Sequence, residues 1–312
     1  GCLDGAFFAL LGSPSPAVLG TDYDALARLV SRRTGKKAMS FSTKGTECYD
    51  RGVSAALLGL ARTFLPEERP EIRPRTVNLL GATPLDLTHR RNVDAVREIL
   101  EGAGFPVQSV WAMGSSLEEI SGSLAAGCNI ALTASAIPTC RWLEERHQMP
   151  WLPGSFSGTA PVRRFLERLD AVTSGRPLPA EAPEGGQTSG PRALVVGEQL
   201  LSNGVRACLE QDLGFGEVDV CTLFGADSAF QRPGDQDHIS ESDLEDRIRA
   251  GGYDLVVGDA LLRELDCPDS ARPFAELPHV AVPSRLGWTS RICPFGPGLL
   301  RLVQDALREK AG

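Results

Sequence analysis

From Arg75 onward, short apolar runs of strand length alternate with stretches of helical periodicity. Residues 76–81 and 128–133 read as buried strands, and between them residues 92–102 place valine, isoleucine and leucine on one helical face. Alternation of this kind is typical of βαβ units, in which crossover helices join parallel strands. The sequence therefore predicts an α/β fold of stacked Rossmann-like domains with parallel sheets.

The same pattern predicts further elements along the chain. Additional strands are expected at residues 107–111, 193–197, 218–223, 254–258 and 280–283. Additional helices are expected at residues 139–147, 162–169, 200–213 and 299–307, with Pro161 near the start of the second. Ser116 with Glu119, and Ser242 with Glu245, match the capping box that begins a helix.

Composition divides the chain into segments. Residues 173–191 are rich in Pro, Gly, Ser and Glu, which indicates a solvated linker between a Rossmann-like domain at 71–172 and another at 192–312. Residues 1–70 predict a truncated N-terminal domain, with an apolar helix at 3–11, helices at 23–31 and 53–61, and a strand at 38–42.

Charge and hydropathy exclude several classes of protein. The formal net charge is −8 and the basic residues are scattered, so no nucleic-acid partner is indicated. No apolar run approaches the ~18 residues of a membrane span, and the N-terminus lacks the features of a signal peptide. Eight cysteines without a CxxC pair favour a reducing compartment, the cytoplasm.

Familiar catalytic motifs are missing. The chain has no GxGxxG, P-loop, HExxH or GxSxG segment, which disfavours nucleotide binding, a metal triad and a serine hydrolase. The histidines are far apart, in contexts that we interpret as polar or solvent-prone; they are His89, His147, His238 and His279. Glycines follow several of the predicted strands. They are explained equally well by tight strand-to-helix turns and by a ligand that binds at the strand ends.

Two groups of residues remain as site candidates. Thr83, Gly114, Ala134 and Ser135 follow predicted strands and would face a ligand cleft at the carboxyl ends of a parallel sheet. Cys48 stands in a polar loop, so its thiolate is available to a metal, whereas most of the other cysteines suit a role as small buried hydrophobes. Cys2 precedes the apolar helix expected at 3–11 and has the same potential.

Several segments together resemble the nitrogenase component 1 family. The resemblance lies in residues 76–81, 114–120 and 129–133, and it is most specific in Trp142-Leu143-Glu144-Glu145-Arg146 followed by Met149-Pro150-Trp151. Residues 18–22, 43–45 and 49–52 resemble upstream family segments, and residues 294–300 resemble the closing one. This family includes nitrogenase subunits, cofactor-assembly scaffolds, dark-operative protochlorophyllide reductase and nickel-sirohydrochlorin reductive cyclase.

The resemblance implies an iron–sulfur protein, but the sequence lacks several of the family's metal ligands. Gly1-Cys2 is similar to the family's first cluster cysteine segment, whereas the second segment is absent and residues 13–16 replace the third without a thiol. The nitrogenase cofactor ligands would fall at Leu132-Thr133 and at residues 284–288, which hold neither cysteine nor histidine. A cluster-only or tetrapyrrole-type relative therefore fits better than a dinitrogen reductase.

Three functions follow from this resemblance. The first is a catalytic-component subunit that takes electrons from an ATP-dependent iron–sulfur reductase and passes them through a [4Fe-4S] cluster to a substrate, with Cys2 and Cys48 as candidate ligands. The second is a scaffold for cofactor assembly, and the third is a metal-free binder of a tetrapyrrole or small molecule. A second component 1-like subunit or a homodimer is the expected assembly.

Overall fold

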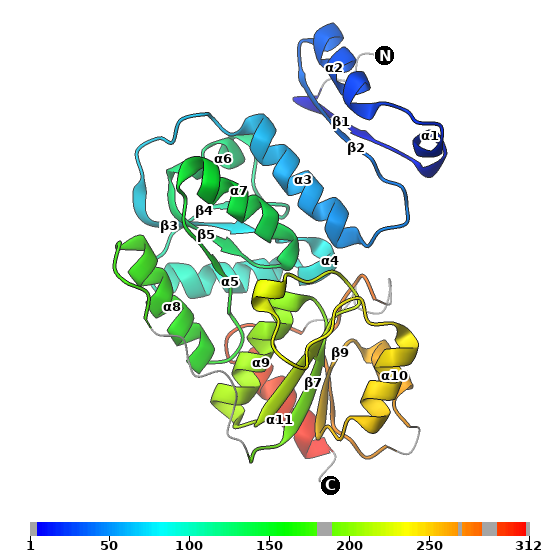
Figure 1. Cartoon of the computed structure of the whole chain (residues 1–312). Helices are drawn as coiled ribbons and strands as arrows, with labels where there is room; N and C mark the ends of the chain where they lie inside the picture. The colour runs from blue at the N-terminus through cyan, green and yellow to red at the C-terminus, as the bar shows by residue number, and fades with distance from the viewer. Residues whose placement is uncertain (1–4, 180–188, 268–269, 283–291, 310–312) are drawn as a thin grey trace.

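The computed structural model describes residues 5–179, 189–267, 270–282 and 292–309. Three separate parallel sheets are formed within these residues, and helices connect and cover their strands (Figure 1). The expected α/β fold of stacked Rossmann-like units is confirmed. None of the helices in the described part of the chain is long and apolar enough to cross a membrane.

The middle sheet has the strand order β4-β3-β5-β6. Its strands are β3 (Arg73–Leu80), β4 (Val107–Val110), β5 (Ala126–Ala131) and β6 (Trp151–Pro153). The helices that follow them are α4 (Pro84–Leu87), α5 (Arg90–Gly102), α6 (Leu117–Ser121), α7 (Ile137–His147) and α8 (Ala160–Thr173). Both faces of the sheet are buried, as is usual for parallel strands.

The C-terminal sheet repeats this topology, with the order β10-β9-β7-β8. Its strands are β7 (Arg192–Val196), β8 (Glu217–Cys221), β9 (Leu255–Gly258) and β10 (Phe274–Glu276), and its helices are α9 (Gln199–Leu213), α10 (Glu241–Ala250) and α11 (Gly298–Glu309). In both sheets the first strand lies between the second and the third. The connections therefore leave in opposite directions at β3/β5 and at β7/β9, which is where such folds bind ligands.

The N-terminal part forms a two-stranded parallel sheet of β1 (Phe7–Leu11) and β2 (Lys37–Phe41), with α1 (Pro14–Val18) and α2 (Tyr23–Thr34) beside it. In Figure 1 this unit lies apart from the C-terminal sheet, and α3 (Tyr49–Phe64) leads from it along the middle unit. Helix α3 packs against α6 and α7, because Leu57 and Ala61 join the same core as Leu143. The second half of α3 is thereby fixed on the middle unit.

Helices α8 and α9 lie side by side where the two large sheets meet (Figure 1). The free N–H groups at the start of α8 are satisfied from the other unit: Thr159 N and Ala160 N donate to Asp212 of α9, at 2.7 and 2.9 Å. Gly158 N also donates to Gly296 O at 2.9 Å. Backbone groups of one unit thus depend on side chains and carbonyls of the other, which fixes how the two sheets face each other.

Three local predictions are wrong. Residues 7–11 form a strand and not the expected helix, because they pair in parallel with β2. Their apolar pattern alone did not predict this long-range pairing. Helix α10 begins two residues earlier than expected, since Ser240 caps the Asp243 N–H in place of the predicted Ser242 and Glu245 box. Residues 280–282 form a turn, and the fourth strand is β10, which pairs with β9. The Ser116 and Glu119 capping box is confirmed.

Gly81 directly follows β3 in a left-handed conformation, with φ +84°. A Cβ atom there would overlap the Thr133 hydroxyl and press on Ala136. We expect Gly81→Ala to lower the free energy of unfolding by about 2–4 kcal/mol, because backbone strain and overpacking add. Gly102→Ala is the matched control: no atom lies within 4 Å of its Cβ position, and we expect a change below about 1 kcal/mol in a urea melt. Equal effects for both variants would refute the role of Gly81.

Candidate functional site

Polar side chains from several segments meet where the carboxyl ends of the two large sheets face each other. We call Tyr49, Asp86, Glu198 and His279 the inter-sheet cluster. Asp86 follows β3, Glu198 follows β7, His279 follows β10, and Tyr49 is the first residue of α3. The cluster thus occupies the two topological switch points, and its members other than Tyr49 are less than 10% exposed.

Asp86 is the centre of the hydrogen bonds. Its Oδ1 accepts a bond from the Tyr49 hydroxyl at 2.5 Å, and its Oδ2 accepts one from the Thr83 hydroxyl, also at 2.5 Å. His279 Nε2 lies 3.4 Å from both Asp86 Oδ1 and Tyr49 Oη. A carboxylate that accepts two short hydroxyl bonds is held in one orientation, so Asp86 fixes the positions of the other groups.

His279 is held from outside the cluster as well. Its backbone N–H donates to Asp259 Oδ2 at 2.9 Å, and its ring centroid lies 5.1 Å from that of Phe224. Its Nδ1 is buried and has no hydrogen-bond partner among the described residues. The sequence-based interpretation of His279 as solvent-prone is therefore wrong, because β9 and β10 carry Asp259 and His279 into the same buried edge.

Tyr49 keeps its proton at neutral pH. Burial, followed by the negative charge of Asp86, raises the pKa of its hydroxyl well above the usual value. Its ring packs edge-on against Phe224, with centroids 4.9 Å apart. Tyr49 therefore acts as a hydrogen-bond donor toward Asp86.

Glu198 bridges the two sheets. Its Oε1 accepts from Ala134 N of the middle unit at 2.6 Å, and its Oε2 accepts from Leu201 N of its own helix at 2.9 Å. Backbone N–H bonds favour the charged form, but burial and the nearby charge of Asp86 outweigh them and raise the Glu198 pKa from 4.5 to about 8. A carboxyl group with this pKa holds a proton at pH 7 and can release it there.

A cavity of about 40 Å³ lies beside the cluster. Asp86, Glu198 and His279 line it together with Asn92, whose Oδ1 is buried and has no partner within the described part of the chain. A space of this size admits a water molecule, and unsatisfied polar atoms such as Asn92 Oδ1 and His279 Nδ1 are the usual partners of a buried water. The site can therefore hold an exchangeable proton carrier next to Glu198.

The predicted cleft residues are only partly brought together. Thr83 donates to Asp86, Ala134 donates to Glu198, and the Ser135 hydroxyl lies 2.8 Å from that of Thr133 beside the same edge. Gly114 does not join them. It follows β4, an edge strand that β3 separates from the switch point, and it is exposed near Arg90. Sequence reasoning missed Asp86, Glu198 and His279, although each stands within six residues of the end of a strand.

The thiols of the described residues do not fit an iron–sulfur cluster by themselves. No group of three or more His, Cys, Asp or Glu with metal-binding geometry occurs in residues 5–179, 189–267, 270–282 and 292–309. Burial raises the thiol pKa of Cys128 and Cys208 to about 12 and that of Cys221 to about 11, and the pKa of Cys140 is shifted upward too. These four thiols stay protonated and are poor metal ligands.

Of the two predicted metal ligands, the structure describes Cys48 but not Cys2. Cys48 immediately precedes α3 and is half-buried, so its thiol sits at a helix start that its side chain does not cap. The position next to Tyr49 places it close in sequence to the inter-sheet cluster. Cys2 lies outside the described residues. A cluster would therefore need thiols beyond Cys48 that the described chain does not supply.

Residues 9–267 match the model of the family described as nitrogenase component 1 type oxidoreductase. The chain belongs to this family. Solved structures of nitrogenase component 1 titled "Nitrogenase Cp1 at pH 6.5" and "Nitrogenase Cp1 at pH 5" superpose with TM-scores of 0.67 and 0.66. Each is 14% identical to this chain, and each superposition covers 98% of this chain and 76% or 70% of the nitrogenase chain. At this identity the similarity shows the fold alone.

Curated component 1 relatives are more similar in sequence. A light-independent protochlorophyllide reductase subunit from Methylobacterium sp. (strain 4-46) is 26% identical over 236 residues, which are 69% of this chain and 47% of that protein. The corresponding subunit from Rhodospirillum rubrum is 34% identical over 113 residues, 36% of this chain and 20% of that protein. This chain thus spans less than half the length of these two relatives.

Proposed function

We propose that this chain is a catalytic-component subunit of a nitrogenase-like oxidoreductase, in which the inter-sheet cluster supplies protons to a substrate that is being reduced. The supporting observation is the buried carboxyl group of Glu198, whose pKa of about 8 keeps a proton available near neutral pH. It stands at the facing switch points of two sheets, the usual ligand position of such folds. Family membership makes reduction the expected chemistry.

Each residue of the cluster has a distinct task in this proposal. Glu198 is the general acid, because it alone of the two buried carboxyl groups is not held by hydroxyl donors. Tyr49 and Thr83 hold Asp86 as a fixed negative charge, which keeps the Glu198 pKa high. His279 Nδ1 and Asn92 Oδ1 hold the water through which Glu198 regains its proton after each transfer.

Electrons reach the substrate from outside the described residues in this proposal. An ATP-dependent iron–sulfur reductase is the proposed donor, and a second component 1-like subunit or a second copy of this chain is the proposed partner. A [4Fe-4S] cluster would supply one-electron transfer if Cys48, Cys2 and thiols of the partner held it together. The described residues alone lack such a set.

That lack favours a second candidate, a metal-free protein of the same fold that binds a tetrapyrrole or another small molecule between the two sheets. Iron and acid-labile sulfide analysis separates the two functions. We expect anaerobically purified protein, co-expressed with its partner, to contain both elements. Cys48→Ser should lower the iron content by at least half, whereas Cys267→Ser, an exposed thiol elsewhere, should leave it unchanged.

Protein that stays free of iron after anaerobic reconstitution with iron and sulfide would sink the iron–sulfur function. The metal-free binder would then be the better account. A folded Cys48→Ser variant with full iron content would remove Cys48 from the ligand set. Circular dichroism of each variant establishes that the fold is retained.

A further inference from the structure

Two buried acidic side chains meet at the inter-sheet cluster, one from each large unit. Asp86 belongs to the middle unit and Glu198 to the C-terminal unit, and both line the cavity of about 40 Å³. Each is 6% exposed, and no lysine or arginine is among the described residues that line this cavity. If both carboxyl groups are ionised, they repel each other, because little solvent and no cationic side chain screens them.

The other titratable groups around Glu198 do not remove this repulsion. From α3, the Tyr49 hydroxyl donates to Asp86 and keeps its proton, because burial and the charge of Asp86 raise its pKa. After β9, Asp259 adds a third buried carboxyl group. After β10, His279 Nε2 lies 3.4 Å from Asp86 Oδ1, and imidazole groups are uncharged at alkaline pH. The proton on Glu198 therefore decides whether like charges face each other here.

The contacts that the described residues make between the units at this edge are individually weak. Glu198 accepts a backbone N–H of the middle unit at 2.6 Å, and Asp50 of α3 accepts from Gly225 N at 3.2 Å. Arg141 of α7 pairs with Asp227, with side chains 45% and 18% exposed, and pairs of this kind contribute little to stability. Repulsion between two buried charges can therefore separate the units at this edge.

The segment before α11 has the features of a hinge. Phe295 is buried in the core of the middle unit, and Leu299 is buried in the core of the C-terminal unit. Between these anchors stand only Gly296-Pro297-Gly298, and Gly296 has φ +56°. The carbonyl of Gly296 also accepts from Gly158 N of the middle unit at 2.9 Å. A few residues between two fixed elements are the usual place where a rotation of units is absorbed.

We propose that ionisation of Glu198 opens the two large units about residues 296–298, and that its protonation closes them. This inference rests on the proposed function, in which Glu198 gives its proton to the substrate. Loss of that proton leaves two negative charges at the cluster and opens the cavity, which in the closed form admits only a molecule of about the size of water. Proton transfer is thereby coupled to the exchange of product for substrate.

Double electron–electron resonance between two spin labels measures this opening. The labels are attached to the full chain through unnatural amino acids at Glu145 of α7 and Asp246 of α10, which are exposed and lie on different units (Figure 1). We expect one distance at about pH 6 and a second, longer distance at about pH 9, on either side of the Glu198 pKa of about 8. Because neither substrate nor reductase is present, the result does not depend on whether the chain reduces a substrate.

Glu198→Gln and Asp86→Asn each remove one of the two charges and should keep the shorter distance at both pH values. Glu210→Gln is the matched control, because Glu210 is a buried glutamate of the same helix that pairs with Arg232 inside the C-terminal unit. It should open as the wild type does. A single unchanged distance in the wild type would overturn the proposal, and so would opening of either charge variant or loss of opening in Glu210→Gln. Circular dichroism establishes that each variant is folded.

Discussion

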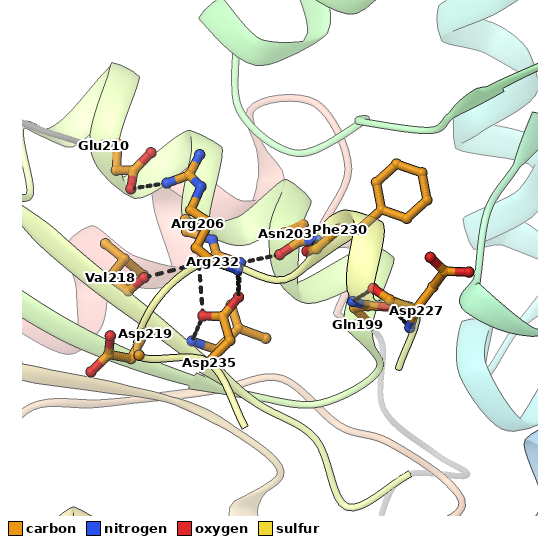
Figure 2. A network of polar contacts seen from close by, with 12 residues as sticks. Gln199, Asn203, Arg206, Glu210, Val218, Asp219, Asp227, Phe230, Arg232 and Asp235 are labelled. Atoms are coloured by element: carbon orange, nitrogen blue, oxygen red, sulfur yellow. Dashed lines mark hydrogen bonds and ion pairs between the residues drawn. The ribbon is translucent and has the colours of Figure 1, made fainter. Parts of the chain in front are cut away.

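Arg206→Met is expected to lower the free energy of unfolding by about 3 kcal/mol or more, because it leaves Asp235 buried without its counter-charge. The two side chains are 2% and 4% exposed. Both guanidinium nitrogens of Arg206 that face Asp235 donate to it at 2.8 Å, and Asn203 accepts a further bond (Figure 2). Asp235 in turn accepts from Val220 N and from Arg232 N, and so joins β8 to the loop that contains Arg232.

Urea denaturation measures this effect. Arg97→Met is the matched control, since Arg97 pairs with Glu101 on the exposed face of α5 at 3.4 Å, and such pairs contribute below about 0.5 kcal/mol. Adding Asp235→Asn to Arg206→Met should recover more than about 1 kcal/mol, because the amide retains an acceptor without a charge. If Arg206→Met alone lowered the free energy of unfolding by less than about 1 kcal/mol, the buried Arg206–Asp235 pair would not be needed for stability.

Glu198→Gln is expected to lower the rate of substrate reduction by about 10²- to 10⁴-fold, the usual contribution of a general acid, while the fold is retained. The glutamine oxygen can still accept from Leu201 N and keep the cap of α9, while its NH2 group takes the place of the oxygen that accepts from Ala134 N, so one bond between the sheets is lost. Asp22→Asn is the matched control, because Asp22 caps α2 in the same way but is exposed. Equal reduction rates for wild type and Glu198→Gln would contradict the assignment.

The same variant changes how stability depends on pH. The Glu198 pKa is about 8 in the folded chain and 4.5 when unfolded, so between these values the folded state holds the extra proton. The stabilisation is complete below about pH 4.5 and is lost as pH rises through 8. Relative to Glu198→Gln, the wild type should lose about 2–4 kcal/mol between about pH 5 and 8.

Most of the two large units could be predicted from the sequence. Parallel strands buried on both faces are continuous apolar runs, such as residues 193–196, and their periodicity differs sharply from that of α5. Short strands could not be predicted in this way. Residues 274–276 form β10 because they pair with β9, and residues 7–11 form β1 because they pair with β2, and both pairings are long-range.

The candidate site was harder to predict than the fold. Thr83 and Ala134 contact Asp86 and Glu198 because they follow β3 and β5, which are neighbours in the sheet. The sequence shows where these strands end, but it does not show the order of the strands. Gly114 follows β4 and lies away from the switch point for this reason. In the sequence, Glu198 and His279 look like ordinary polar loop residues. They are buried only because the carboxyl ends of the two sheets face each other.

An infrared titration of the carboxyl C=O stretch tests the central claim, that the inter-sheet cluster stores a proton near neutral pH. Asp and Glu side chains on the surface are ionised at about pH 7 and give no such band. We expect the wild type to show a protonated carboxyl band at neutral pH that disappears as pH rises through about 8, and we expect Glu198→Gln to lack it. A band already absent at about pH 6, or one that Glu198→Gln retains, would contradict the account.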